Sequence, residues 1–440
     1  MRMLLNIVSI LVICCFHLIS HAETKSTIEV QGLSFISSDF ESVDKSNFWF
    51  IGASLVSNEK APDYFMINLK GFYAPGNTVL NYLNFKEIYF SIDLEPYSKL
   101  HIGRKLKNWS SLDSDWNLGF FQPQFRWNPL SPENQGMTGL FWDHDESNWG
   151  MTLFASPVFI PDQSAGYEVK NGQFETANPW FNPPPQNIKF QGQVLPIDYK
   201  INKPETSDVV LQTLYAAQLR FGEKRGLFAN LSAAYKPSNQ FAVGYTGVLV
   251  TNKVKIDLTP KTYTENDYAT DVGYKDSWGL AQISFLASKP HTASFQNVSN
   301  TPIIEDSFSW GPKFIYNLKP FQFEVSYFDA QGGNVSETGP DTSADRAALT
   351  QVYLFHQAVQ LQIKYSEIYL RRMKLESSIQ YRQSMKDPFK QIRFSNRFVI
   401  KGPWSFNSDI LLIDTDDDSN LKMNAYRNLD QFWIGAMYDL

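Results

Sequence analysis

Basic side chains recur on one side of three consecutive segments in the last quarter of the chain. Between residues 372 and 382 they alternate with apolar residues such as Leu375 and Ile379, which is the two-residue period of a β-strand. Cations that share one face of a confined space would focus a positive potential there and attract small anions. Carboxylates elsewhere could balance them and leave only a hydrated wall, because the formal net charge is −6. The basic residues are Lys364, Arg372, Lys374, Arg382, Arg393 and Arg397.

The segment 107–136 is a second candidate, because it combines large aromatic side chains with acidic ones. The aromatic rings would be costly to expose to water, and Pro123, Pro129 and Pro132 limit the backbone conformations. We expect this segment to fold into an enclosed space and narrow it, carrying carboxylates towards the opening. The alternative is a packed surface loop that closes over the entrance. The residues expected to form the constriction are Trp109, Asp113, Asp115, Trp116, Phe121, Arg126, Trp127 and Glu133.

The elements that must position these residues are strands, because alternation runs through most of the chain. It is clear in the segments 86–94, 320–328 and 389–401. The segments are about 10 to 16 residues long, whereas strands of globular proteins average about 5–6 residues. That length crosses a bilayer if the strands are tilted. Tryptophans such as Trp149 and Trp404 stand near segment ends, as in the aromatic girdles of membrane barrels.

The pattern therefore predicts an all-β fold, a single transmembrane antiparallel β-barrel of about 18 strands, within a range of about 16 to 20. An even count requires the segment 188–201 to be one of the barrel strands. Short turns such as 317–320 alternate with longer connections, of which 107–136 and 159–186 are the richest. Membrane barrels have short periplasmic turns and long outer loops. We expect one barrel domain over residues 23–440.

The first 22 residues have the features of a cleaved secretory signal peptide. Arg2 is followed by an apolar stretch and by the ending Ser20-His21-Ala22, which fits a signal-peptidase site. Cys14 and Cys15 lie in this stretch and are the two cysteines of the chain, so we expect no disulfide and no thiolate metal site. The acidic balance argues against a nucleic-acid partner. We expect no cofactor and no metal.

One stretch carries a family resemblance. The run Gly103-Arg104, followed by Trp109, Asn128-Pro129-Leu130 and the glycines up to Gly139, resembles the Gly-Arg, Trp and Asn-Pro pattern of porin-like and polysaccharide-export barrels of Gram-negative outer membranes. The third-loop signature of the general porins is absent. The resemblance implies a pore whose third outer loop narrows the lumen.

The chain ends in QFWIGAMYDL, an alternating stretch that we expect to close the barrel. It resembles the C-terminal signal by which the barrel-assembly machinery recognises its clients, with Gly435, Tyr438 and Leu440 in the signal positions. This resemblance implies the assembly machinery as a partner during biogenesis, and outer-membrane lipid and lipopolysaccharide as the surroundings.

The function that we expect is an outer-membrane, porin-like channel for the diffusion of small hydrophilic solutes, anions among them. Export of a polysaccharide or other polymer is the main alternative, and a non-conducting structural or adhesive barrel is the second. A homo-oligomer is compatible with the sequence. We expect no enzyme, because no nucleophile motif occurs. A lipase would need a histidine and a serine paired on the lipid-facing wall, and His356 has no serine near it in the sequence. A pair formed with a residue distant in the sequence is the alternative left open.

Overall fold

The computed structural model describes residues 24–36, 47–57, 64–181, 183–222, 225–291, 295, 298–338, 355–370, 373–400, 402–415, 426–427 and 429–440. The predicted signal peptide and Arg372 lie outside these residues. Most of the described chain is strand, with two short helices, α2 (Ser111–Trp116) and α3 (Thr206–Val210), and a 3₁₀ turn at Thr78–Leu80. No helix in the described part of the chain is long and apolar enough to cross a membrane.

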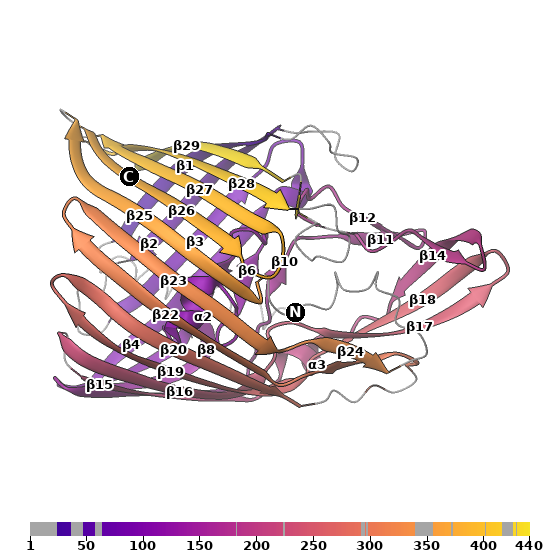
Figure 1. The fold of residues 1–440 in the computed structure, drawn as a ribbon, viewed down its shortest axis with the longest axis horizontal. Coiled ribbons are helices and arrows are strands. Elements are labelled where there is room, and N and C mark those ends of the chain that lie inside the picture. The colour runs from indigo at the N-terminus through magenta and orange to yellow at the C-terminus, as the bar shows by residue number, and fades with distance from the viewer. Residues whose placement is uncertain are drawn as a thin grey trace, which may run out of the picture.

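Eighteen strands form one closed antiparallel barrel (Figure 1), which confirms the predicted fold class and the central strand count. Each strand pairs with the next one along the chain, and the last pairs with the first. The barrel strands are β1 (Thr24–Phe35), β2 (Asn47–Ser57), β3 (Tyr64–Tyr73), β4 (Tyr82–Glu95), β5 (Ser98–Lys105), β8 (Met137–Asp145), β9 (Trp149–Ser156), β15 (Leu214–Gly222), β16 (Gly226–Pro237), β19 (Thr264–Asp276), β20 (Gly279–Pro290), β22 (Ser307–Leu318), β23 (Phe321–Gly332), β25 (Gln357–Leu370), β26 (Met373–Ser384), β27 (Phe389–Ile400), β28 (Trp404–Thr415) and β29 (Gln431–Asp439).

The last ten residues close the barrel. Strand β29 pairs antiparallel with β1 from Thr27 opposite Asp439 to Phe35 opposite Gln431. The N–H of Leu440 donates to the carbonyl of Ser26 at 2.9 Å, so pairing continues to the final residue. Closure removes the two open edges that a sheet would otherwise present.

The two rims differ in the length of their connections. One rim carries short turns such as 96–97, 146–148 and 277–278, together with the C-terminus. The other rim carries the long connections, which include 106–136, 157–213 and 238–263. This is the asymmetry that the sequence predicts.

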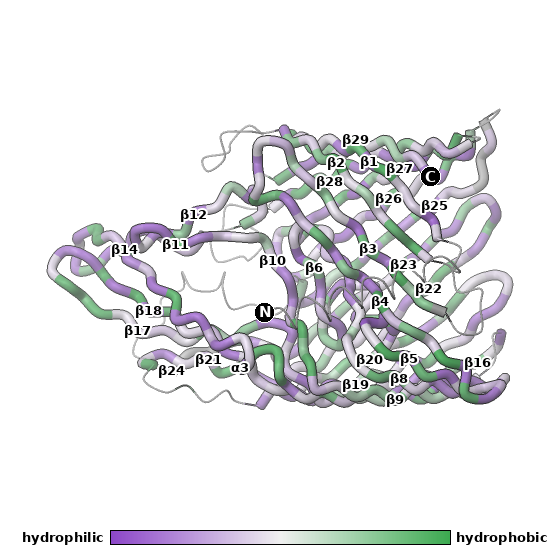
Figure 2. The backbone as a smooth tube through the Cα atoms, turned by 180° about the vertical axis from the view of Figure 1, so that it is seen from behind, coloured by the Kyte–Doolittle hydropathy of each residue, from purple (hydrophilic) through white to green (hydrophobic). Residues whose placement is uncertain are grey.

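The prediction that 188–201 is a barrel strand is wrong. Its residues form β13 (Asn187–Phe190) and β14 (Gln193–Ile201), which belong to a separate four-stranded sheet with β17 (Ala242–Val250) and β18 (Lys253–Lys261). Strand β14 runs parallel to β18, so two long connections are joined outside the barrel. Figures 1 and 2 show this sheet projecting from the long-loop rim. Alternation reports that a strand has two faces, and it does not report which sheet the strand joins.

The outer surface of the barrel is apolar. Hydrophobic residues recur along the tube in Figure 2, and many point outwards, with exposed fractions of 74% for Leu227, 50% for Ile102 and 45% for Leu140. The side chains between them face inwards, where Phe141 and Ser91 are fully buried. Contiguous exposed apolar surface of this kind suits lipid and not water.

Gly103 in β5 is a position where the barrel wall needs a glycine. Its φ is +131°, and an added Cβ would lie 2.3 Å from the carbonyl oxygen of Ile88. We expect Gly103→Ala to destabilise the barrel by about 1–3 kcal/mol and to lower the temperature at which the folded band is lost in a heat-modifiability gel. Gly247→Ala is the control, because nothing lies within 4 Å of an added Cβ there. Equal melting of both variants would contradict this assignment.

Candidate functional site

The connection 106–136 folds into the barrel. Its helix α2 begins after Ser110, whose side chain accepts a hydrogen bond from the N–H of Asp113. The carboxylate of Asp113 accepts the N–H groups of Phe120 and Phe121, each at 3.0 Å. Burial raises the pKa of Asp113, and the two hydrogen bonds from backbone N–H groups oppose the shift. Asp113 therefore stabilises the backbone of the loop from inside and does not face an open space.

Wall strands on opposite sides of the barrel hold the loop in place. On one side the hydroxyl of Ser232 in β16 donates to the carbonyl of Trp109 at 2.6 Å, and the N–H of Ser111 donates to the carboxylate of Asp271 in β19. Across the lumen Asn128 donates to the Gln431 side chain in β29 at 3.1 Å. The loop therefore spans the interior.

Most aromatic residues of the loop are buried and hold the loop inside the barrel through ring contacts. Trp109 is 2% exposed and stacks on Phe121, with ring centroids 6.2 Å apart. Trp116 packs against Phe328 of the wall at 5.3 Å. Trp127 packs against Tyr82 and against Trp180 of the next long connection, at 4.7 and 4.6 Å. Burial of these rings, each worth about 1.5–3 kcal/mol or more, favours the loop inside the barrel over the loop in water.

Arg126 joins two long connections. It lies on β6 (Gln124–Arg126), which runs parallel to β10 (Gln163–Ser164) of the following connection. Its Nε lies 3.1 Å from the carboxylate of Asp162, and the N–H of Gln124 donates to the same carboxylate at 2.7 Å. Burial raises the pKa of Asp162 to about 6, although Arg126 and the backbone hydrogen bond lower it.

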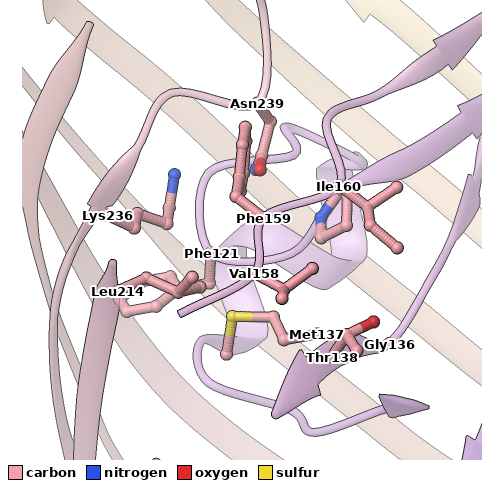
Figure 3. Close-up of a pocket in the computed structure, with 11 residues that line it drawn as sticks. Phe121, Gly136, Met137, Thr138, Val158, Phe159, Ile160, Leu214, Lys236 and Asn239 are labelled. Carbon is pink, nitrogen blue, oxygen red and sulfur yellow. The ribbon is translucent and has the colours of Figure 1, made fainter. Parts of the chain in front are cut away.

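A small pocket lies behind the loop. Figure 3 shows Phe121, Phe159 and Leu214 packed beside Lys236 and Asn239. Its volume of about 10 Å³ is no more than one water molecule needs. This pocket is part of the packing that holds the loop and is too small for a solute.

Two larger chambers, each lined by several charged residues, lie between the loop and the opposite wall. Their volumes are about 480 and 630 Å³. Both are lined by Ser131 and Glu133 of the loop and by Lys364 and Arg393 of the wall, so the two chambers adjoin. Of the residues expected in the constriction, Asp115, Trp127 and Glu133 line a chamber, whereas Trp109, Asp113, Trp116, Phe121 and Arg126 do not.

Four of the predicted basic residues line these chambers. Arg382 lines the smaller one, Arg397 the larger one, and Lys364 and Arg393 both. Lys374 lies on the same face of β26 as Glu376, with 2.8 Å between the ammonium and the carboxylate, and Glu376 lines the larger chamber. Arg372 lies outside the described residues.

The cations of the wall differ in how far they are neutralised. Arg393 pairs with Asp409 at 2.8 Å, and Lys364 lies 3.9 Å from Glu324. Arg382 donates to the Gln360 side chain at 2.6 Å and to the carbonyl of Asp115 at 3.1 Å. In the part of the chain that the structure describes, neither Arg382 nor Arg397 has a carboxylate within 4 Å.

The carboxylates of the loop are balanced by neighbouring lysines. Asp115 pairs with Lys313 of β22 at 2.8 Å, and Glu133 lies 3.7 Å from Lys86 of β4. Sequence analysis missed Lys313, because it is an isolated cation on an otherwise ordinary strand. It also missed Ser131, whose hydroxyl accepts a hydrogen bond from Arg393 at 3.2 Å, because a serine next to a proline is typical of any turn.

The fold and the lumen together define a porin-like barrel, a wide closed sheet with an internal loop facing a charged wall. No protein-family model matches the chain, and no curated protein matches it. Among solved structures, the chain is similar to Acinetobacter baumannii OccAB4, with 10% identity, coverage of 95% of this chain and 98% of that one, and a TM-score of 0.49.

Two further solved structures are similar to the chain to the same degree. Pseudomonas aeruginosa OprD has 9% identity, coverage of 95% of both chains and a TM-score of 0.46. Pseudomonas aeruginosa OccK2, solved in complex with glucuronate, has 9% identity, coverage of 96% of this chain and 98% of that one, and a TM-score of 0.48. The comparisons give no support to the polysaccharide-export resemblance.

The contact between Arg126 and Asp162, which joins the two long connections, makes the stability of the barrel depend on pH. Its pKa of about 6 exceeds the value of about 3.9 in an unfolded chain. The folded state therefore binds the extra proton between pH 4 and 6, and its stability falls as the pH rises through this window, by about 3 kcal/mol in total. We expect Asp162→Asn, which keeps an acceptor for the Gln124 N–H, to abolish this component.

The measurement is the apparent melting temperature of the barrel in detergent from pH 4 to 7.5, for the wild type and Asp162→Asn. The wild type should lose more stability than the variant as the pH rises through this window. Parallel curves would contradict the assignment of the pKa to this buried carboxyl.

Proposed function

We propose that this chain is a channel of the Gram-negative outer membrane that passes small hydrophilic solutes and favours anions. The observation that supports the proposal most directly is the pair of chambers, lined by charged residues, between the internal loop and the wall of β25–β27. A solute that crosses the barrel would pass through these chambers, beside the hydrogen bond between Ser131 of the loop and Arg393 of the wall.

The proposed location rests on the outer surface of the barrel. A closed sheet leaves no unpaired backbone edge in lipid, and outward residues such as Leu227 and Ile102 are apolar. We propose that the short-turn rim faces the periplasm, as in other membrane barrels. We also propose that Gly435, Tyr438 and Leu440 form the assembly signal and that lipid and lipopolysaccharide surround the barrel.

The preference for anions rests on the imbalance of charge across the chambers. Asp115 and Glu133 on the loop are balanced by Lys313 and Lys86. On the wall, Arg382 and Arg397 have no carboxylate within 4 Å among the described residues. Charges in a narrow low-dielectric passage act over longer distances than charges in open water, so these two guanidinium groups should make the passage positive.

The size of the chambers favours small solutes over a polymer. Volumes of about 480 and 630 Å³ are in the range of sites for small molecules, about 300–1,000 Å³. The loop is held by hydrogen bonds to strands on both sides of the lumen, through Ser232 and Gln431. A polymer exporter would have to move this loop aside, and a solid structural barrel would have no such chambers.

The charge of the wall can be tested by ion selectivity. We expect the reversal potential of the purified protein in a planar bilayer, under a KCl gradient, to show preference for chloride. Arg397→Glu should move the chloride-to-potassium permeability ratio several-fold towards potassium, because it adds a negative charge beside the passage. Lys189→Glu is the matched control, since Lys189 is exposed on the sheet outside the barrel. An unchanged ratio in Arg397→Glu would contradict the proposed path.

A further inference from the structure

The outer face of the barrel carries a hydrogen-bonded chain of serine, histidine and glutamate. The hydroxyl of Ser98 lies 2.8 Å from Nδ1 of His144, and Nε2 of His144 lies 3.3 Å from Oε1 of Glu146. The indole N–H of Trp149 donates to the other carboxylate oxygen of Glu146 at 3.0 Å. Glu146 is thus held in place from the side away from the histidine.

Neighbouring strands bring these residues together at the short-turn rim. Ser98 begins β5, His144 stands next to the end of β8, and the two are direct cross-strand partners. Glu146 follows in the turn between β8 and β9, and its N–H donates to the carbonyl of Trp149 at 2.9 Å. Ser98 and His144 are 46 residues apart, which is why no local sequence motif shows the pair.

The pair points away from the lumen. The outward residues of β8 alternate from Leu140, which is 45% exposed, through Trp142 to His144, whereas Phe141 and Asp143 between them are buried inside. Aromatic rings surround the histidine, with ring centroids 5.0 Å away for Trp149, 6.0 Å for Trp142 and 6.5 Å for Tyr97. Tryptophan and tyrosine in such a belt lie at the boundary between lipid headgroups and acyl chains.

The hydrogen bonds define the direction of proton transfer. Because the Glu146 carboxylate can only accept, Nε2 of His144 carries the proton that it shares with Glu146. Nδ1 is then left as the acceptor for the Ser98 hydroxyl. A serine paired with a basic histidine nitrogen, with an acid orienting the ring, is the arrangement that activates a serine for attack on an acyl group.

We propose that Ser98, His144 and Glu146 form an acyl-ester hydrolase site whose substrate class is the ester of a membrane glycerolipid. Oγ of Ser98 attacks the acyl carbonyl carbon while its proton passes to Nδ1 of His144. The carbon–oxygen bond to the glycerol breaks, and the leaving alkoxide takes the proton from His144. Water then attacks the acyl-serine, gives a proton to His144 and releases the fatty acid, and the proton returns to Ser98.

The location selects the substrate class. The ester bonds of glycerolipids lie at the headgroup boundary, the level at which the belt of Tyr97, Trp142 and Trp149 would hold this site. Ser98 is only 5% exposed, so the ester must enter between the rings around His144. The choice of a membrane glycerolipid as substrate rests on the proposed membrane location. It does not depend on conductance, because the lumen lies on the other face of the wall.

The reactivity of Ser98 as the nucleophile can be tested without a membrane. The full-length protein in detergent micelles is treated with a fluorophosphonate probe, and the adduct is located by mass spectrometry. We expect a covalent adduct on Ser98, no adduct at this position in Ser98→Ala, and at least tenfold slower labelling in His144→Asn. Ser277→Ala is the matched control and should label like the wild type, since Ser277 stands in another short turn beside Trp278.

The reaction is tested in mixed micelles that contain phosphatidylethanolamine. The wild type should release fatty acid, and Ser98→Ala and His144→Asn should release at least tenfold less. Absence of an adduct on Ser98, unchanged labelling in His144→Asn, or no fatty acid from the wild type would each overturn the proposal. Heat-modifiability gels show which variants are folded, and the wild-type adduct position decides the question if Ser98→Ala fails to fold. Conductance measured on the same preparations separates failure of this site from failure of the channel.

Discussion

Closure of the eighteen-stranded sheet is the constraint on which the rest of the structure depends. Every barrel strand pairs with two neighbours, and the pairing of β29 with β1 closes the barrel. Once the barrel is closed, the two-residue period of each strand divides its side chains between an outer and an inner surface. The outer surface is mostly apolar, so most polar residues of the strands are directed into one shared interior.

A barrel of this width leaves an interior that side chains of the wall alone do not fill. The connection 106–136 occupies part of that space, and its aromatic residues are its attachment. Trp109 stacks on Phe121 within the loop, and Trp116 packs against Phe328 of the wall. Trp127 packs against Tyr82 and against Trp180 of the next connection. The polar groups that remain, Asp115, Ser131 and Glu133, then line the chambers together with the basic residues of β25–β27. The Ser131 hydroxyl and the Asp115 carbonyl accept hydrogen bonds from Arg393 and Arg382. The packing of the aromatic rings thus determines which polar groups of the loop line the chambers.

Much of the fold can be read from the sequence, because strand length and alternation are local properties. The segment 188–201 shows the limit: it alternates like a barrel strand, yet β14 pairs with β18 in a sheet outside the barrel. The site is harder to predict, because it depends on register between distant segments. The aromatic content of 107–136 indicates burial, but nothing local indicates that Arg126 pairs with Asp162 or that Asp115 pairs with Lys313. Ser98 and His144 meet only because β5 and β8 are paired in one register.

The central claim is that the internal loop borders the path of the solute, and cysteine accessibility tests it most directly. Both cysteines of the chain lie in the predicted signal peptide, so Ser131→Cys would carry the only thiol of the mature protein. A negatively charged methanethiosulfonate reagent should react with this thiol and reduce the single-channel current in a planar bilayer by a large fraction, and Ser277→Cys on the short-turn rim should show little change. A current that stays constant after complete modification of residue 131 would contradict the account.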